Sequence, residues 1–228
     1  MNVTFEGDIR GEGTTTLGQN NKVSLGSKSI QNAIVFNQNS HLQLNNNNPE
    51  ISQNFSGALT IVGSNSALTG VGMWFLSGNI SFDPGLDAAS EFEPWLTINT
   101  SNAQDVLGFG ELHANANVAQ TAKLVKTGNG VLDFGFNTRI EGNIRLVVEG
   151  GSVQASSQTL QGHVDLQAAD ATLIFNQDSD GSYIGQLRGE GIFEKRGGGV
   201  LTLTSNSQGF TGATAIADGA LNVAQDAR

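Results

Sequence analysis

The chain has 228 residues, of which only 14% are charged, against about a quarter in an average soluble protein. Eleven basic and 21 acidic residues leave a net charge of −10, which argues against nucleic acid as a partner, because phosphate-tracking surfaces need clustered Lys and Arg. The absence of cysteine excludes disulfides, thiolate nucleophiles and cysteine-ligated zinc.

The first residues, MNVTFEGDIR, lack the basic and apolar regions of a signal peptide. The longest apolar run is also far shorter than the ~20 residues that span a bilayer. We therefore expect either a cytosolic protein or a fragment of an exported one.

Short pairs of apolar residues, two positions apart, recur along the whole chain, whereas helical periodicity is nearly absent. Side chains alternate across a strand, so each pair sends two apolar groups to one face. This pattern predicts an all-β chain of short strands. The thirteen pairs are Val3/Phe5, Val23/Leu25, Ile34/Phe36, Leu42/Leu44, Leu59/Ile61, Ile80/Phe82, Leu96/Ile98, Leu132/Phe134, Leu146/Val148, Val164/Leu166, Leu173/Phe175, Leu201/Leu203 and Leu221/Val223.

Internal repetition indicates how the strands are connected. Lys126-Thr-Gly-Asn-Gly-Val-Leu132 matches Lys195-Arg-Gly-Gly-Gly-Val-Leu201, and Gly151-Ser-Val153 matches Gly219-Ala-Leu221 at nearly the same offset. The offset from Lys126 to Lys195 suits three solenoid coils of about 23 residues each. We expect a single right-handed parallel β-helix over residues 1–228, of about ten coils, with Gly and Asn at left-handed corners.

The segment from Leu187 to Thr204, LRGEGIFEKRGGGVLTLT, resembles the autotransporter-associated β-strand repeat. It continues through Phe210-Thr-Gly212 and ends Gly219-Ala-Leu-Asn-Val223, as the family pattern does. Residues 107–153 follow that pattern loosely, 9–46 carry only its opening, and 47–106 do not match. The resemblance therefore covers about a third of the chain.

The resemblance implies type V secretion by a Gram-negative bacterium. Such proteins have a signal peptide, a right-handed β-helical passenger and a C-terminal outer-membrane barrel, and this chain looks like a passenger fragment without the other two parts. It implies an extracellular or cell-surface location. Basic residues such as Lys123, Lys126, Lys195 and Arg196 are expected to be corner residues of this repeat.

The segment 72–95 interrupts the repeat and is our candidate for a contact surface. It combines two of the three prolines with both tryptophans and several carboxylates, and loops on rigid scaffolds often carry binding function. The alternative is a solvated turn of helix with Trp95 packed against the body. The candidate partner-binding residues are Trp74, Asp87, Glu91, Glu93 and Trp95.

No motif in the sequence indicates a catalytic or metal site. His41, His113 and His163 are far apart, none begins a His-Glu-x-x-His motif, and all three are expected to be exposed. A Gly-x-Ser-x-Gly elbow and a P-loop are also missing. The run 176–181 copies the first half of an EF-hand loop, but Leu187 stands where the last carboxylate ligand belongs, which favours an Asp-Gly turn that closes a coil.

These observations predict a monomeric, non-enzymatic passenger segment without cofactor or metal, which contacts a host cell-surface protein or glycan as an adhesin or receptor ligand. One alternative is an inert stalk that displays another domain. A polysaccharide-active enzyme is a third reading, because paired carboxylates on some β-helices act on glycans.

Overall fold

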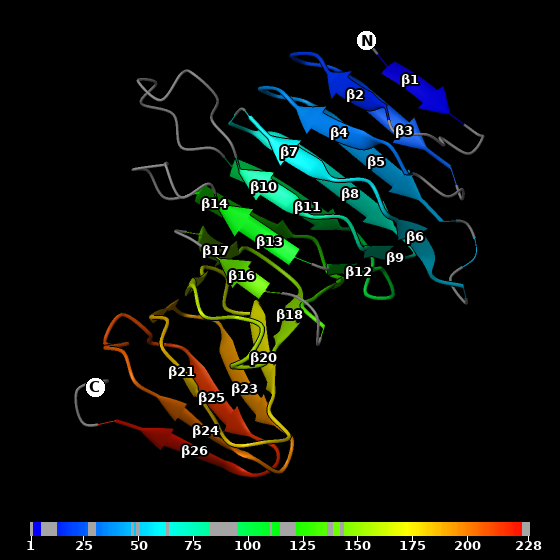
Figure 1. The fold of residues 1–228 in the computed structure, drawn as a ribbon. Coiled ribbons are helices and arrows are strands. Elements are labelled where there is room, and N and C mark those ends of the chain that lie inside the picture. Colours follow the sequence, from blue (N-terminus) through cyan, green and yellow to red (C-terminus); the bar gives the residue numbers. More distant parts are fainter. Residues whose placement is uncertain are drawn as a thin grey trace.

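The computed structural model describes residues 2–5, 13–26, 31–46, 48, 51–62, 64–82, 95–109, 111–114, 122–135, 139–141 and 144–224. Within them, 2–5, 111–114 and 139–141 are described as backbone only. All regular elements of this described part are β-strands, and every strand pairing is parallel. The chain therefore winds as a β-solenoid, with β1 at one end and β26 at the other (Figure 1).

From β5 onward, most coils pass through three sheets in turn. Sheet A contains β1 (Asn2–Phe5), β3 (Lys22–Leu25), β5 (His41–Asn45), β8 (Ser66–Val71), β11 (Trp95–Thr100), β14 (Ala122–Thr127), β17 (Ile144–Val148), β19 (His163–Leu166) and β22 (Leu187–Gly189). Sheet B contains β6 (Gln53–Phe55), β9 (Met73–Leu76), β12 (Val106–Phe109), β15 (Val131–Asp133), β18 (Ser152–Ala155), β20 (Thr172–Asn176), β23 (Ile192–Arg196) and β25 (Ala213–Ile216).

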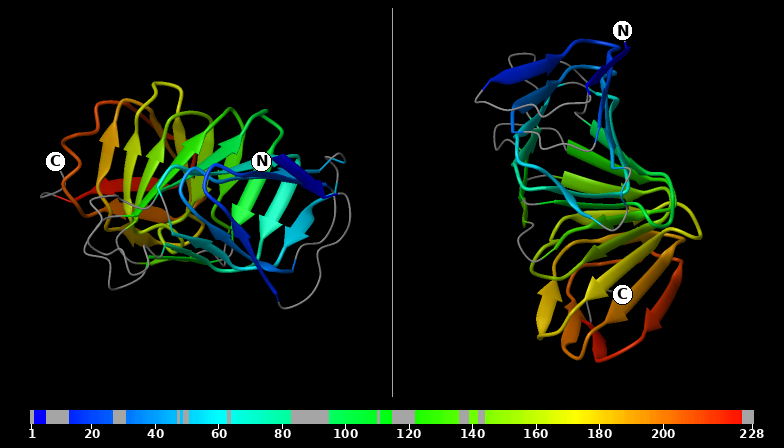
Figure 2. Two further views of the ribbon diagram at one scale, coloured as in Figure 1. Left: turned by 90° about the horizontal axis from the view of Figure 1, so that it is seen from above. Right: turned by 90° about the vertical axis from the view of Figure 1, so that its right-hand side faces the viewer.

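The third side of the solenoid is divided between two sheets. Sheet C contains β2 (Thr14–Leu17), β4 (Ala33–Phe36), β7 (Leu59–Ile61), β10 (Ile80–Phe82), β13 (Glu111–Ala114) and β16 (Arg139–Glu141). Sheet D contains β21 (Gly181–Tyr183), β24 (Val200–Leu203) and β26 (Ala220–Val223). Between β18 and β19, where every residue is described, the chain turns without a strand on this side. Strand direction changes along the stack, as twisted sheets require (Figure 2).

The solenoid has about eight turns, fewer than the ten expected from the sequence. The reason is uneven coil length. The length of a coil is the number of residues between two register partners in neighbouring coils. One short coil separates Leu146 from Val164, whereas longer ones separate Leu42 from Leu68 and Leu68 from Ile98. Because the coils between β5 and β14 are the longest, a coil length taken from the repeat in the second half of the chain overestimates the number of coils.

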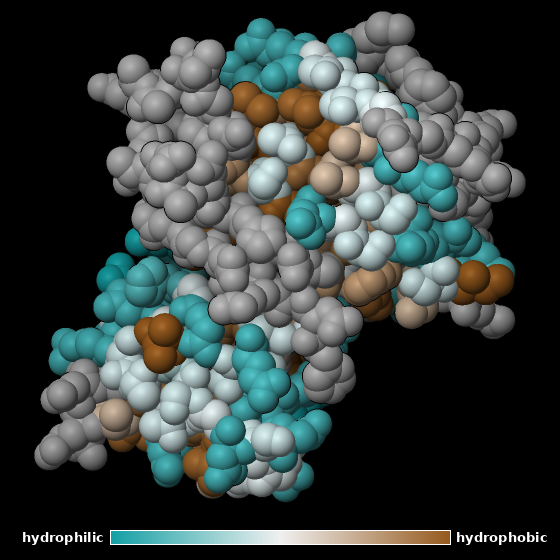
Figure 3. Space-filling view, viewed as in Figure 1, coloured by the Kyte–Doolittle hydropathy of each residue, from teal (hydrophilic) through white to brown (hydrophobic). Residues whose placement is uncertain are grey.

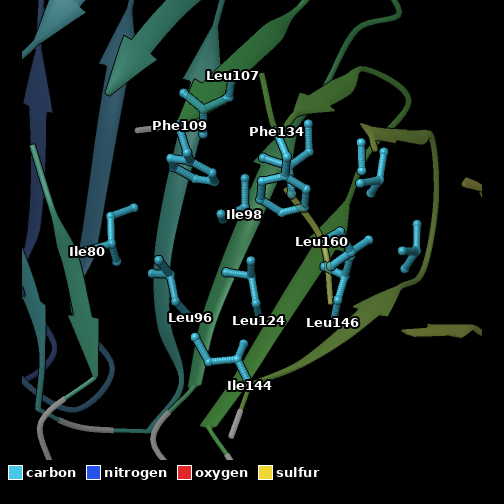
Figure 4. Close-up of a cluster of buried hydrophobic side chains, with 14 of the residues drawn as sticks. Ile80, Leu96, Ile98, Leu107, Phe109, Leu124, Phe134, Ile144, Leu146 and Leu160 are labelled. Atoms are coloured by element: carbon cyan, nitrogen blue, oxygen red, sulfur yellow. The ribbon is translucent and has the colours of Figure 1, made fainter. Parts of the chain in front are cut away.

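The core is one continuous stack of apolar side chains inside the three sheets. All thirteen apolar pairs lie on strands or at their ends, and ten of them are buried at both positions. Leu96, Leu124 and Leu146 occupy matched positions in β11, β14 and β17, and the rings of Phe109 and Phe134 stack 6.1 Å apart (Figure 4). Full burial of each such side chain contributes about 1.5–3 kcal/mol, so short strands suffice when every coil adds to the stack.

Asparagine occupies left-handed corners, as the sequence predicts. Asn20, Asn39 and Asn65 have φ angles of 60°, 57° and 57°, in three consecutive coils before sheet A. The Asn65 amide Nδ2 donates to Asn39 Oδ1 at 2.8 Å, so these side chains also link neighbouring coils. Asn tolerates this backbone region because its short polar side chain hydrogen-bonds locally.

The two Lys-x-Gly-x-Gly motifs form the same corner structure in different places. Lys126 precedes the corner from sheet A to sheet B, whereas Lys195 precedes the corner from sheet B to sheet D. Three coil steps carry the register from Lys126 through Val148 and Leu166 to Gly189, which stops short of Lys195. The two lysines are therefore separated by three coils plus one face, and not by three whole coils as expected.

Both motif lysines point inward and are fully buried. The Lys126 ammonium donates to the carbonyl oxygens of Thr127, Gly128 and Gly150 at 2.8, 2.9 and 3.2 Å. Each lysine thus joins the carbonyls of its own corner to one in the following coil. The expectation of a corner residue fits Lys126 and Lys195, but it is wrong for Lys123, which lies on the outer face of β14.

Lys195 repeats this arrangement. Its ammonium donates to the carbonyl oxygens of Arg196, Gly197 and Asp218 at 2.8, 2.5 and 3.2 Å, and to Gln177 O at 3.4 Å. A buried ammonium is tolerated in the core because backbone carbonyls replace the hydrogen bonds it makes with water.

Candidate contact surface

The segment 72–95 is not irregular throughout. Residues 73–76 and 80–82 are strands β9 and β10, which pair with neighbouring coils in sheets B and C. These two strands form because every second side chain is apolar and points into the core, as strand geometry requires. The inward side chains are Trp74, Leu76, Ile80 and Phe82. The rest of the expected interruption, residues 83–94, lies outside the described residues.

The structure separates the two tryptophans. Trp74 is 2% exposed, and its indole N–H donates to the carbonyl of Val71 at 3.2 Å, so it packs in the core and offers nothing to a partner. The prediction that Trp74 belongs to a contact surface is wrong, because its side chain in β9 points into the core. The three acidic candidates, Asp87, Glu91 and Glu93, lie outside the described residues.

Trp95 is half-buried at the start of β11 and remains a surface candidate. The ammonium group of Lys123, its register partner in β14, lies 5.3 Å from the centre of the indole ring. This is within the range of a cation–π contact. The indole Nε1 of Trp95 is buried and has no hydrogen-bond partner among the described residues.

The register of sheet A extends this pair into a row of basic side chains. Lys123 lies opposite Arg145, and Arg145 opposite His163, on the outer face. Arg188 lies in the adjoining column, opposite Asp165, and its guanidinium donates to Gln186 Oε1 at 2.9 Å. We call Trp95, Lys123, Arg145, His163 and Arg188 the cationic face.

The sequence did not predict the cationic face, although it marks Trp95 and Lys123 as separate features. Its members belong to different coils, lie far apart in the chain and meet only because the coils stack in register. The available signal was a basic residue near the start of successive sheet A strands. Locating those strands needed the coil lengths, which vary.

A shallow pocket of about 270 Å³ opens beside the place where the third side of the solenoid lacks a strand. Asp133, Phe134, Gln154, Ser156, Thr159 and Asn176 form part of its wall. Burial raises the pKa of the Asp133 carboxyl, which accepts no hydrogen bond from any described residue. Among the described residues, Asp133 is the one carboxylate in this wall.

The histidines do not share a site. His41 is half-buried, with Nε2 2.8 Å from Thr69 Oγ1, and burial together with the nearby Lys22 charge lowers its pKa. Its expected full exposure is therefore wrong. His163 is exposed, and the side chain of His113 lies outside the described set.

The EF-hand-like run 176–181 connects two coils. The carboxylate of Asp180 accepts a hydrogen bond of 2.8 Å from the backbone N–H of Val200, in the next coil. This contact is what an Asp-Gly turn closing a coil requires. Within the described ranges, no three His, Asp or Glu side chains gather in a way that would hold a metal ion.

The visible surface is largely polar. On the face shown in Figure 3, hydrophilic and weakly polar residues predominate over apolar ones. The exposed large apolar residues of the described part are Ile51, Phe75, Ile184, Ile216 and Val223, of which Ile216 and Val223 share the last coil. In that part of the chain, no helix is long and apolar enough to cross a membrane.

No family model matches this chain, and searches of curated proteins and of solved structures return no significant match.

Proposed function

We propose that this chain is a passenger segment of an autotransporter, secreted or displayed at the bacterial surface, which acts by non-catalytic contact with host cells. The observation that carries the proposal is the pair of lysine corners. Lys126 and Lys195 are the motif residues of the resemblance, and both form the same buried cage of carbonyl contacts. The repeat motif thus corresponds to a repeated structural unit.

Non-catalytic contact is supported by the chemistry of the surface. A stack of parallel coils presents broad, open sheet faces, which suit binding better than enclosure of a substrate. Glycoside hydrolysis uses two carboxylates, whereas Asp133 stands alone among the described residues in the wall of the pocket. A polysaccharide-active enzyme is accordingly the less supported reading.

An inert stalk is the second candidate, favoured by the continuous core and the many small polar side chains outside it. An attachment experiment distinguishes the two candidate functions: inert beads coated with residues 1–228 are applied to mammalian epithelial and endothelial cells. A contact protein predicts attachment above that of albumin-coated beads, and inhibition by the soluble chain. A stalk predicts attachment equal to that of the albumin control.

A further inference from the structure

The cationic face is unusual in an acidic protein. Of the eleven Lys and Arg residues, Lys126 and Lys195 are buried in corners, and Arg196 forms an ion pair of 2.7 Å with Glu194. That pair is the one ion pair between described residues. The charges of the cationic face are therefore not neutralised within the described part of the protein.

The side chains of this face are accessible. Arg145, His163 and Arg188 are exposed, and the Lys123 ammonium contacts the Trp95 ring instead of a carboxylate. Because strands stack about 4.8 Å apart, Lys123, Arg145 and His163 form a straight row along the solenoid axis. The backbone under these three residues is held firmly, since β14, β17 and β19 are each paired with a strand on both sides.

We propose that the cationic face binds a linear acidic glycan, which lies along the solenoid axis with its sulfate or carboxylate groups on Lys123, Arg145 and Arg188. Lys123 and Arg145 are one coil apart, and Arg188 follows two coils beyond Arg145 in the adjoining column, so cations are spaced along the axis as a chain of repeated negative charges requires. The arginine forks suit planar carboxylate and multi-oxygen sulfate acceptors. This inference rests on the proposed function for the setting in which the glycan is met, namely a host cell surface.

The charge distribution favours a narrow ligand over a broad one. The protein as a whole carries a charge of −10, so a wide anionic surface such as a membrane would also face its acidic regions. A single glycan chain contacts only the row, and charges beyond about 8 Å are largely screened at physiological salt. Asp165 lies beside the row, which limits the attraction to ligands that reach the arginines directly.

The test is direct binding in solution. Heparin-derived hexasaccharide is titrated into residues 1–228 and followed by calorimetry, with neutral dextran of similar size as the control ligand. Arg145→Gln and Arg188→Gln should each weaken binding about tenfold, the effect of losing about 1.4 kcal/mol from one charged hydrogen bond. Arg196→Gln removes the same charge from sheet B and should leave binding unchanged.

Two checks keep the result interpretable. Circular dichroism and thermal unfolding should be the same for the three variants, because all three side chains are exposed. Binding should also weaken as salt is raised. The proposal is overturned if the hexasaccharide does not bind, if Arg196→Gln weakens binding as much as Arg145→Gln, or if phosphatidylserine vesicles bind while the glycan does not.

The same variants separate this proposal from the proposed function. If beads attach to cells and Arg145→Gln has no effect, host contact stands and the glycan site is wrong. If the hexasaccharide binds in solution but beads do not attach to cells, the glycan site stands and the proposed function is wrong.

Discussion

The Lys126 ammonium donates a hydrogen bond of 3.2 Å to the carbonyl oxygen of Gly150, which belongs to the following coil. Lys195 makes the same contact, also at 3.2 Å, with the carbonyl of Asp218. The next residue is glycine in both cases, Gly151 and Gly219, with φ near +66° and +69°. A Cβ there would lie 2.8 or 2.9 Å from the ammonium, so the motif pairs a lysine in one coil with a glycine in the next.

Removal of the Lys126 ammonium should destabilise the fold. Lys126→Met keeps the apolar stem but leaves Thr127, Gly128 and Gly150 carbonyls without their donor. Loss of a buried hydrogen-bond partner costs about 1–3 kcal/mol, and urea unfolding measures it. Lys123→Met, which changes a side chain on the outer face of the same strand, is the control. Equal stability of the two variants would contradict a stabilising role for the contacts between the Lys126 ammonium and these carbonyls.

The lowered pKa of Lys126 should also make the stability of the protein depend on pH. Burial lowers the pKa of its ammonium to about 8, from an ordinary value near 10.5. Between these values the unfolded chain binds more protons than the folded one, so stability rises as pH increases from 8 towards 10. The increase should be smaller in Lys126→Met, and urea midpoints at pH 8 and 9.5 measure the difference.

At higher pH, the ionisation of Tyr183 has the opposite effect on stability. Burial raises the pKa of its phenol, so above about pH 10 the unfolded chain ionises first and stability falls. Comparing wild type with Lys126→Met at each pH cancels this contribution. A stability difference between the two proteins that does not change with pH would contradict the lowered pKa of Lys126.

Neighbouring glycines of one corner should respond differently to alanine. Gly197 has φ +78°, and a Cβ there would meet Asp178 Oδ1 at 2.6 Å, whereas a Cβ on Gly198 would meet nothing within 4 Å. Gly197→Ala should cost more than about 1 kcal/mol, and Gly198→Ala should be neutral or slightly stabilising. Thermal unfolding of the two variants decides this, and equal midpoints would be the contrary result.

The two tryptophans should differ in fluorescence. Trp95→Phe leaves Trp74, 2% exposed, as the single tryptophan of the chain. Its emission should be shifted to short wavelength and should resist quenching by acrylamide, because the indole lies in the core. Emission and quenching like those of free tryptophan would show that Trp74 is on the surface after all.

The periodicity of the sequence predicts the fold class well, because inward positions of a strand are apolar wherever the core demands it. Ten pairs such as Ile34/Phe36 are buried as expected. The pattern misses strands such as β14 and β23, in which a lysine takes an inward position beside Leu124 or Phe193. Apolarity alone does not identify such strands.

The surface was harder to predict than the core. Trp74 lies two positions before the inward Leu76, whereas Trp95 lies directly before the inward Leu96, and the structure accordingly places one tryptophan in the core and the other on the outer face. The cationic face depends on which residues stack across coils of unequal length. Local sequence carries no direct signal of that alignment, so Arg145 and Arg188 could not be grouped beforehand.

Host-cell contact is tested most directly by an equilibrium binding curve of fluorescently labelled residues 1–228 on mammalian epithelial and endothelial cells. The account predicts saturable binding, competed by excess unlabelled protein. Binding that rises linearly with concentration and is not competed would contradict it, and would leave an inert stalk as the better description.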